Sequence, residues 1–216
     1  MKNARFSAVA VLAVLALFSS LTACTSAGYE AQQGTPKGLA PGAEFSFEGN
    51  TVRYSDKDMV VEASYLSPAQ ADLYVSIYKE GRFKNPFPSS FWVFQMAIEN
   101  RSRKDVTFNP GMAYLIPMKG KPTQPEDYAD FYSSLQLAEA EDIDERMEAF
   151  KAAALDTAKT IRPGEKAQGL LVFSSEKGGQ GKKNPQDSAV LVLNNIYVGS
   201  KPRTVPLQFK GTITGR

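Results

Sequence analysis

Residues 91–99 read FWVFQMAIE, and this stretch decides the fold class. It is rich in aromatic and β-branched residues, and its first half is apolar on both faces, as in a strand buried on two sides. Residues 100–102, NRS, form a turn that leads into a second short β segment, VTF at 106–108. The stretch therefore predicts two strands joined by a short connection.

Further β segments flank this pair of strands. FSFEGNTVRY, which starts at residue 45, and DMVVEASYL, which starts at residue 58, are separated by Ser55-Asp56-Lys57, a hairpin signal. Ser67-Pro68 is typical of a helix N-cap followed by proline at the first helical position, so we expect a short helix near 68–79. Later strands are expected at 113–118, 170–173, 189–193, 205–209 and 212–214.

Residues 126–160 have a different periodicity. Apolar side chains recur there three and four residues apart, which is the spacing of one helix face. A second helix is expected before them, around 127–138. The carboxylates at 142, 144 and 145 lie near the start of the later helix, where they favour the helix dipole. The apolar residues with this spacing are Ile143, Met147, Phe150, Ala154 and Ala158.

The order of these elements predicts a mostly β fold. Strands before and after a helical segment fit one antiparallel β-sandwich domain, residues 44–216, with a helical insertion at about 126–160. A parallel α/β sheet fits worse, because strands and helices do not alternate along the chain.

The first residues carry an export signal. Lys2 and Arg5 precede an uncharged apolar run at 6–18, and small residues follow it. The run is far shorter than the roughly 20 residues that span a bilayer. We therefore interpret residues 1–23 as a signal peptide rather than as a permanent transmembrane helix.

Leu21-Thr22-Ala23-Cys24 resembles the lipobox of bacterial lipoproteins. The resemblance implies that a diacylglyceryl group joins the Cys24 sulfur, that cleavage follows Ala23, and that the acyl chains anchor the protein to a membrane. A secreted protein with a chance cysteine is the alternative. Residue 25 is not Asp, so in a Gram-negative cell the resemblance implies that the anchor lies in the outer membrane. In a Gram-positive cell the anchor lies on the outer face of the cell membrane. Residues 24–43 then form the lipidated cysteine and a flexible tether.

Composition excludes several kinds of chemistry. Removing residues 1–23 removes two of the 25 basic residues and none of the 23 acidic ones, so the mature side chains are neutral overall and give no support for nucleic-acid binding. The chain has no histidine, and its one cysteine is Cys24. This argues against histidine-based catalysis, histidine or thiolate metal sites and disulfides. We expect a protein that is not an enzyme and has no cofactor.

Three segments together are similar to immunoglobulin-like domains of bacterial surface lipoproteins. They are FQMAIENRS at 94–102, VTFNP at 106–110 and IRPGEKAQGLLVF at 161–173. In those domains a strand ends in Ile-x-Asn-x-Ser, and a Pro-Gly-Glu turn feeds a strand that reads Gly-x-Leu-x-Phe. The resemblance implies an immunoglobulin-like sandwich that binds or scaffolds, and it carries over no functional residue beyond Cys24.

Three polar patterns are better explained by structure than by chemistry. The acidic run at 142–145 lacks the glycine and the further acids of an EF-hand, so it indicates charges at a helix start. The glycine-rich stretch 178–183 lacks the spacing of a phosphate-binding loop and indicates a hairpin tip. The serine pairs at 89–90 and 174–175 have no lysine or histidine base in a suitable context.

An aromatic segment is the candidate interaction surface. Its members surround the sequence KNPFP at 84–88; core packing is the alternative explanation for them. Two hypotheses of function remain. One is a binding or scaffolding module for another cell-envelope component, and the other is a small-ligand-binding lipoprotein with a pocket between the sandwich and the helical insertion. The aromatic residues are Tyr74, Tyr78, Phe83, Phe87 and Trp92.

Overall fold

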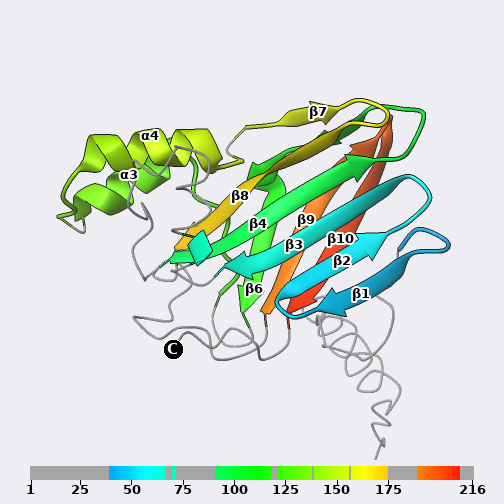
Figure 1. The fold of residues 1–216 in the computed structure, drawn as a ribbon, viewed down its shortest axis with the longest axis horizontal. Helices are drawn as coiled ribbons and strands as arrows, with labels where there is room; N and C mark the ends of the chain where they lie inside the picture. The colour runs from blue at the N-terminus through cyan, green and yellow to red at the C-terminus, as the bar shows by residue number, and fades with distance from the viewer. Residues whose placement is uncertain are drawn as a thin grey trace, which may run out of the picture. The chain divides into compact units, whose positions relative to one another are not determined.

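The computed structural model describes residues 39–66, 70–71, 91–117, 121–137, 139–155, 157–174 and 189–209. The chain divides into two compact units, residues 1–35 and residues 36–216, and every described residue belongs to the second unit. That unit is a mostly β domain built from two antiparallel sheets, with two helices at one end (Figure 1). The expected β-sandwich with a helical insertion is confirmed.

The first sheet has the strand order β1-β2-β3-β4-β8. Strand β4, which contains FWVFQMAIE, lies between β3 and β8. In register, Ile98 of β4 lies opposite Val61 of β3, and Phe94 lies opposite Leu171 of β8. The strands are β1 (Glu44–Glu48), β2 (Thr51–Ser55), β3 (Met59–Leu66), β4 (Phe91–Asn100) and β8 (Lys166–Ser174).

The second sheet has the order β10-β9-β5-β7, and β6 also pairs with β9. Strands β5 and β6 share β9 as a neighbour: β5 pairs with its end at Tyr197–Val198, and β6 pairs with residues 189–193. The elements are β5 (Val106–Phe108), the 3-10 helix η1 (Pro110–Met112), β6 (Ala113–Pro117), β7 (Lys159–Ile161), β9 (Ala189–Val198) and β10 (Lys201–Phe209).

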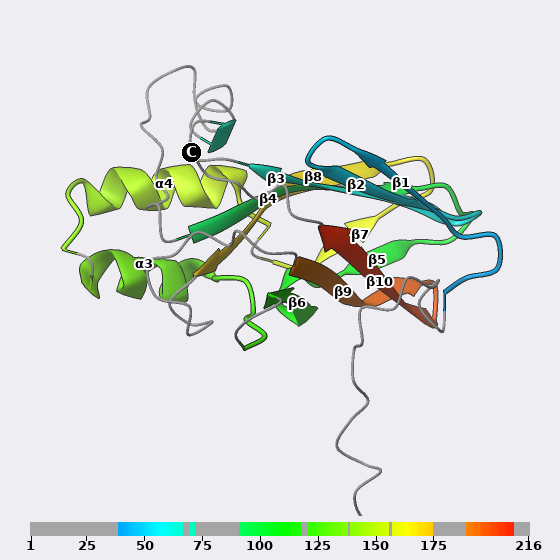
Figure 2. The same ribbon diagram turned by 90° about the horizontal axis from the view of Figure 1, so that it is seen from below.

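Strand β4 contributes to two separate cores. Trp92 and Phe94 are buried in the core between the two sheets, whereas Phe91 and Val93 are buried in a second core against the helices. Alternate side chains of a strand point to opposite faces, so a strand that is covered on both sides must be apolar on both sides. The apolar start of this strand therefore reflects its position between the second sheet on one face and the helices on the other (Figure 2).

The helical insertion consists of α3 (Tyr128–Leu137) and α4 (Ile143–Ala153). Phe131 of α3 stacks on Phe150 of α4 with ring centroids 4.5 Å apart, and Phe91 of β4 meets Phe131 edge-on at 5.5 Å. Leu135 and Met147 complete the contact with the first sheet. We refer to residues 126–153 as the helical insert.

The insert is shorter than the periodicity predicted. Helix α4 ends at Ala153, and Ala154 forms a parallel bridge to Leu170 of β8. A side chain at Gly169 would approach Leu155 Cγ within 2.8 Å, so glycine permits this close crossing. The predicted helical residues after Ala153 therefore lead directly into β7.

The remaining differences concern the start of the domain. FSFEGNTVRY contains a turn of its own at Gly49, with φ of +58°, and is therefore the β1–β2 hairpin. Residues 39–43, expected in the tether, include the buried Ala40, and Leu39 packs against the sandwich core. Of the short helix expected near 68–79, only Gln70 and Ala71 are described, and both are helical. The strand expected at 212–214 lies outside the described residues.

Candidate binding surface

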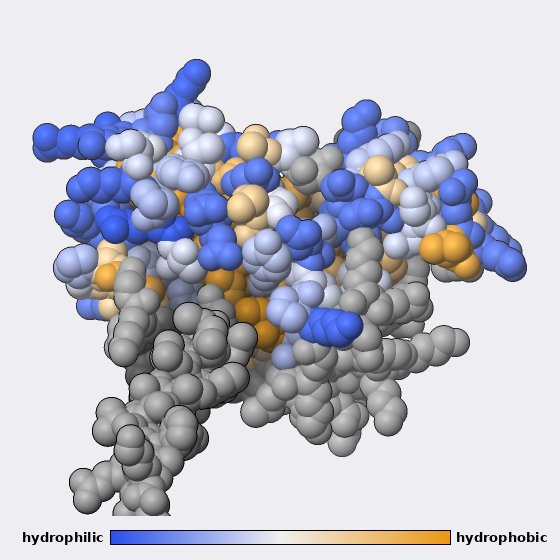
Figure 3. All heavy atoms as spheres, turned by 180° about the vertical axis from the view of Figure 1, so that it is seen from behind, coloured by the Kyte–Doolittle hydropathy of each residue, from blue (hydrophilic) through white to orange (hydrophobic). Residues whose placement is uncertain are grey.

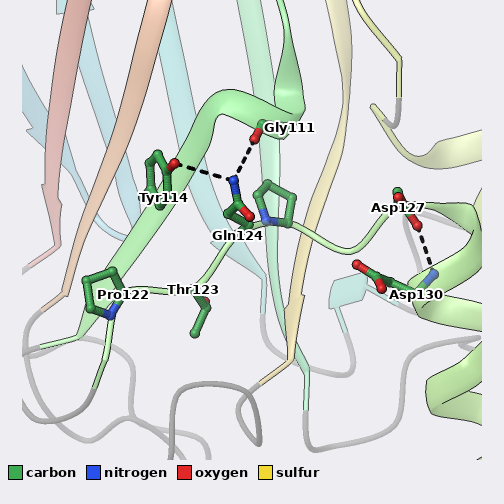
Figure 4. A pocket seen from close by; sticks show the side chains of 8 residues that line it. Gly111, Tyr114, Pro122, Thr123, Gln124, Asp127 and Asp130 are labelled. Atoms are coloured by element: carbon green, nitrogen blue, oxygen red, sulfur yellow. Dashed lines mark hydrogen bonds between the residues drawn. The ribbon is translucent and has the colours of Figure 1, made fainter.

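A cleft of about 410 Å³ lies where the helical insert leaves the sandwich. Its walls come from η1 and β6 on one side, from the segment before α3 on the second, and from the first turn of α3 on the third (Figure 4). The lining residues are Gly111, Tyr114, Pro122, Thr123, Gln124, Pro125, Asp127 and Asp130.

Hydrogen bonds fix the segment that crosses the cleft. The backbones of Leu115 and Thr123 exchange two hydrogen bonds of 2.9 Å each. The Gln124 side-chain amide donates to the Gly111 carbonyl at 3.2 Å and to the Tyr114 hydroxyl at 3.4 Å. These bonds connect the segment to η1 and β6, so the cleft is a structured feature of the fold.

Asp127 immediately precedes α3 and lines the cleft. Its Oδ1 accepts a hydrogen bond from the backbone N–H of Asp130 at 2.8 Å, and its carbonyl accepts from the N–H of Phe131 at 3.0 Å. A carboxylate at this position satisfies one of the unpaired amides at a helix start, which explains why Asp is favoured there. Both Asp127 and Asp130 are exposed, and together they make this side of the cleft acidic.

Thr123 is the unusual member of the lining. Its side chain is only 4% exposed, and its hydroxyl has no hydrogen-bond partner among the described residues. A buried hydroxyl without a partner typically costs about 1–3 kcal/mol. The hydroxyl is closed to solvent, so a ligand in the cleft would meet other atoms of the lining first.

The insert is strongly acidic although the mature chain is neutral. Residues 126–153 contain nine carboxylates and two cationic side chains, which gives a net charge of −7. All of these carboxylates except that of Glu126 are exposed. On α4 the side chains of Met147 and Phe150 are buried, whereas Asp144, Glu145 and Glu148 lie on the outward side. The outer surface of the insert is therefore anionic.

Exposed aromatic and aliphatic side chains accompany this charge. Tyr128 and Tyr132 of α3 are 45% and 40% exposed, and Leu137 at the end of the helix is 87% exposed. The two tyrosines are four residues apart and therefore neighbours on one helix side. Viewed from behind, the molecule is mostly hydrophilic, and apolar side chains show at the helical end on the right as well as near the centre and on the left (Figure 3). The insert thus offers both apolar contact area and negative charge.

The structure corrects one residue of the predicted interaction surface. Trp92 is 2% exposed and belongs to the core between the sheets, because it alternates with Phe91 along β4. It cannot contact a partner from there. Tyr74, Tyr78, Phe83 and Phe87 lie outside the described residues, as do Ala23 and Cys24.

The other patterns singled out in the sequence add no chemistry among the described residues. Asp142, Asp144 and Glu145 lie at the start of α4, and the described part of the chain contains no group of three or more potential metal-ligating side chains. Ser174 is buried in β8. The stretch 178–183 and the serines at 89, 90 and 175 lie outside the described residues. Across the described ranges, no helix is long and apolar enough to cross a membrane.

A pocket between the sandwich and the helical insertion was one hypothesis from the sequence, but the residues that line the cleft were not identified. Tyr114, Thr123 and Asp127 come from a strand, an irregular segment and a helix start, and nothing in their spacing links them. The only local signal was Asp127, whose position three residues before Asp130 suits a helix cap.

Comparisons with known proteins assign no family. No protein-family profile matches the sequence, and no curated protein is detectably similar to it. Among solved structures, the "putative lipoprotein (ycdA)" of Bacillus subtilis is 15% identical to this chain, with a TM-score of 0.38. The match covers 74% of this chain but only 38% of the length of the Bacillus protein. The yjhA protein of Bacillus subtilis is 14% identical with a TM-score of 0.35, covering 76% of this chain and 96% of the other. A functionally unknown protein of Listeria monocytogenes is 11% identical with a TM-score of 0.40, covering 78% and 87%.

Proposed function

We propose that this chain is a lipid-anchored, non-enzymatic module of the bacterial cell envelope that binds or scaffolds another envelope protein. The export signal and the Leu21-Thr22-Ala23-Cys24 lipobox support the anchor. The acyl chains on Cys24 hold the protein on a membrane, and the tether leaves the domain outside the bilayer. The membrane is the outer membrane in a Gram-negative cell and the cell membrane in a Gram-positive one.

The scaffold in this proposal is an immunoglobulin-like sandwich. Strands β3-β4-β8 correspond in order to the A-B-E strands of such a sandwich, and β10-β9-β5 correspond to G-F-C. Strand β7 then takes the place of C′ beside β5, and the helical insert lies in the connection that leads to it. Domains of this architecture commonly present loops and insertions for binding on a rigid core.

The exposed side of α3 is the observation that carries the binding function. Phe131 and Leu135 attach this helix to the first sheet, yet Tyr128, Tyr132 and Leu137 remain exposed on it. Aromatic side chains that protrude from a rigid support are typical of interface centres. The insert is therefore the proposed contact surface.

Photo-crosslinking in intact cells tests this proposal. A photoreactive amino acid replaces Leu137 on the insert, and in a matched chain it replaces Phe47, which is 61% exposed on β1. We expect one specific protein adduct from position 137 and none of the same mass from position 47. Equal adduct patterns from both positions, or no adduct from position 137, would refute the proposed contact surface.

A small-ligand site is the second candidate function. Among the described residues, the Phe131–Phe150 stack and its buried neighbours occupy the interface between the helices and the first sheet. The cleft beside Thr123 and Asp127 is the described cavity that lies between sandwich and insert, and its volume is within the usual range of ligand sites. A small amine that raises the melting temperature of the wild-type chain but not of an Asp127→Asn chain would favour this function, because Asp127 lines the cleft and is exposed.

A further inference from the structure

We propose that copies of this chain associate head to tail, so that the helical insert of one copy docks on the opposite, basic end of the sandwich of the next copy. This inference rests on the proposed binding function and names the partner as a second copy of the same chain.

The end of the sandwich far from the insert is basic. Four segments meet there, and backbone hydrogen bonds of 2.8–2.9 Å join them. Together they contain eight cationic side chains and five carboxylates, which gives a net charge of +3. We refer to this surface as the basic end, and its segments are residues 56–58, 99–105, 162–166 and 199–203. The hydrogen bonds run from the N–H of Arg101 to the Asp58 carbonyl, from that of Asn100 to the Glu165 carbonyl, and from that of Gly199 to the Asp105 carbonyl.

Most cations of the basic end are available to a partner. Three of the eight already pair with carboxylates of the sandwich, at distances of 2.8–3.9 Å. The other five are exposed and form no ion pair within the described part of the chain. This surface therefore presents positive charge to solvent. The five exposed cations are Lys57, Arg103, Lys104, Arg162 and Lys201.

The insert and the basic end lie at opposite ends of β4 (Figure 1). Phe91 at the start of the strand packs against the helices, whereas Asn100 at its end bonds to Lys104 within the basic end. Ten residues of a strand span about 30 Å, which is three times the Debye length of about 10 Å at 0.1 M salt. The two charged surfaces are therefore screened from each other within one copy, and only contact between copies brings them together.

Aromatic and apolar side chains are exposed at both ends. The exposed side of α3 presents Tyr128, Tyr132 and Leu137. Beside the basic end, Tyr197 is 40% exposed and lies opposite the exposed Pro202 in the pairing of β9 with β10. The charged ends of Arg and Lys are attracted to aromatic faces, so the tyrosines of α3 suit the cations of the basic end. Each surface thus offers contact area as well as charge.

The charge balance of the chain favours a second copy over an unrelated basic partner. Outside the insert, the mature chain has 21 cationic side chains and 14 carboxylates, a net charge of +7 against −7 on the insert. A contact between copies neutralises an acidic and a basic surface at once, whereas an unrelated basic segment leaves the basic end uncovered. The lipid anchor acts in the same direction, because it confines copies to one membrane surface and raises their effective concentration.

The contact joins two different surfaces, so it repeats. Each bound copy keeps one insert or one basic end free for a further copy. Contacts of this head-to-tail type close into rings or continue as open rows. A row of anchored copies along the membrane is the physical form that this contact gives to the scaffolding role.

Charge reversal at each end tests the contact, with the purified lipidated chain followed by sedimentation equilibrium in density-matched detergent. Glu145→Lys/Glu148→Lys reverses two exposed charges of the insert, and Arg103→Glu/Lys201→Glu reverses two of the basic end. The wild type should form a salt-sensitive series of oligomers. Each variant alone should associate about tenfold more weakly. An equimolar mixture of the two should recover association, because each supplies the charge that the other lacks.

Two controls separate this contact from a general charge effect and from misfolding. Glu44→Lys/Glu48→Lys adds the same charge at exposed positions of β1 and should associate as the wild type does. Recovery in the mixture cannot come from misfolded chains. In intact cells, the photoreactive amino acid at position 137 should give an adduct of two copies that maps to the basic end, and Arg103→Glu/Lys201→Glu should abolish this adduct.

The outcomes separate this inference from the proposed function. A wild type that is monomeric at low and at high salt would overturn the head-to-tail contact, and so would a mixture that fails to recover association. Equal weakening by the β1 and the insert substitutions would do the same. An adduct at position 137 with a different protein would overturn it as well, but would leave the binding function standing. Absence of any adduct at position 137 would instead refute the binding function.

Discussion

The side-chain amide of Asn100 donates a hydrogen bond of 2.8 Å to the backbone carbonyl of Ile161 and so joins the end of β4 in one sheet to β7 in the other. The same amide donates to the Lys104 carbonyl at 2.7 Å, and its oxygen accepts from the N–H of Ser102 at 2.9 Å. The backbone of Asn100 bonds to Gly164 and Glu165. The Ile-x-Asn-x-Ser and Pro-Gly-Glu motifs therefore meet at one junction between the sheets.

Asn100→Ala should destabilise the domain. Asn100 is fully buried, and removal of its amide leaves the carbonyls of Ile161 and Lys104 without these donors. We expect the free energy of unfolding to fall by about 2–4 kcal/mol. Urea denaturation measures this change. Ser102→Ala, which removes a partly exposed hydroxyl, should cost about 1 kcal/mol or less, and a similar loss in both variants would contradict the central role of Asn100.

Phe150→Ala should loosen the insert without disordering the sandwich. Phe150 is fully buried and stacks on Phe131, so truncation leaves a cavity between α3, α4 and the first sheet. The free energy of unfolding should fall by about 3–5 kcal/mol. In far-ultraviolet circular dichroism, the helical signal should be lost at a lower temperature than in the wild type. The control is Lys151→Ala at the neighbouring exposed position, which should change stability by about 0.5 kcal/mol at most. Equal effects of the two substitutions would show that the helices do not depend on this stack.

Thr123→Val should stabilise the protein. The substitution removes a buried hydroxyl that lacks a partner among the described residues, and it keeps nearly the same shape. We expect a gain of about 1 kcal/mol in the free energy of unfolding, measured by urea denaturation. Thr123→Ser keeps the hydroxyl and should give no such gain. A loss of stability in the valine chain would mean that the hydroxyl is already satisfied in the free protein.

Stability should fall in alkaline solution because of Tyr54. Burial and the hydrogen bond from its hydroxyl to Asp56 raise the pKa of Tyr54 above its ordinary value of 10.0. Above pH 10 the unfolded chain loses this proton while the folded chain keeps it, so rising pH favours unfolding. Below pH 10 the stabilisation is fully present.

Tyr54→Phe provides the matched comparison for this effect. Unfolding free energies measured from pH 8 to pH 11 should decline less steeply in the phenylalanine chain than in the wild type. Burial also raises the pKa of Tyr65, so part of the alkaline decline should persist in the variant. If the unfolding free energy fell with pH equally steeply in both chains, Tyr54 would be excluded as a source of the alkaline decline.

Cys24→Ser should leave the precursor unprocessed. Lipid attachment in the proposed pathway requires the Cys24 sulfur, and cleavage after Ala23 follows that attachment. Metabolic labelling with a fatty acid and gel mobility should show an unlabelled chain that keeps residues 1–23. Thr25→Ser is the control, because it changes a neighbouring residue and leaves the thiol. Normal labelling or cleavage of the Cys24→Ser chain would contradict the lipid anchor.

The sequence predicted the features that depend on local pattern. FWVFQMAIE requires a strand covered on both faces, because apolar side chains on both sides cannot remain in water. The spacing of Ile143, Met147 and Phe150 predicted α4 for the same reason, since these residues lie on one helix side.

Tertiary contacts decided what local pattern left open. The helical spacing continued to Ala158, but α4 ends at Ala153, where the next residue, Ala154, forms a bridge to Leu170. The sequence left open whether the aromatic residues near KNPFP lie at the surface or in the core, and Trp92 is buried between the sheets. The cleft brings together Tyr114, Thr123 and Asp127, whose proximity depends on how β6 and α3 pack. Charge and hydrophobicity are carried by the residues themselves, whereas exposure and convergence depend on which distant segments cover or meet them.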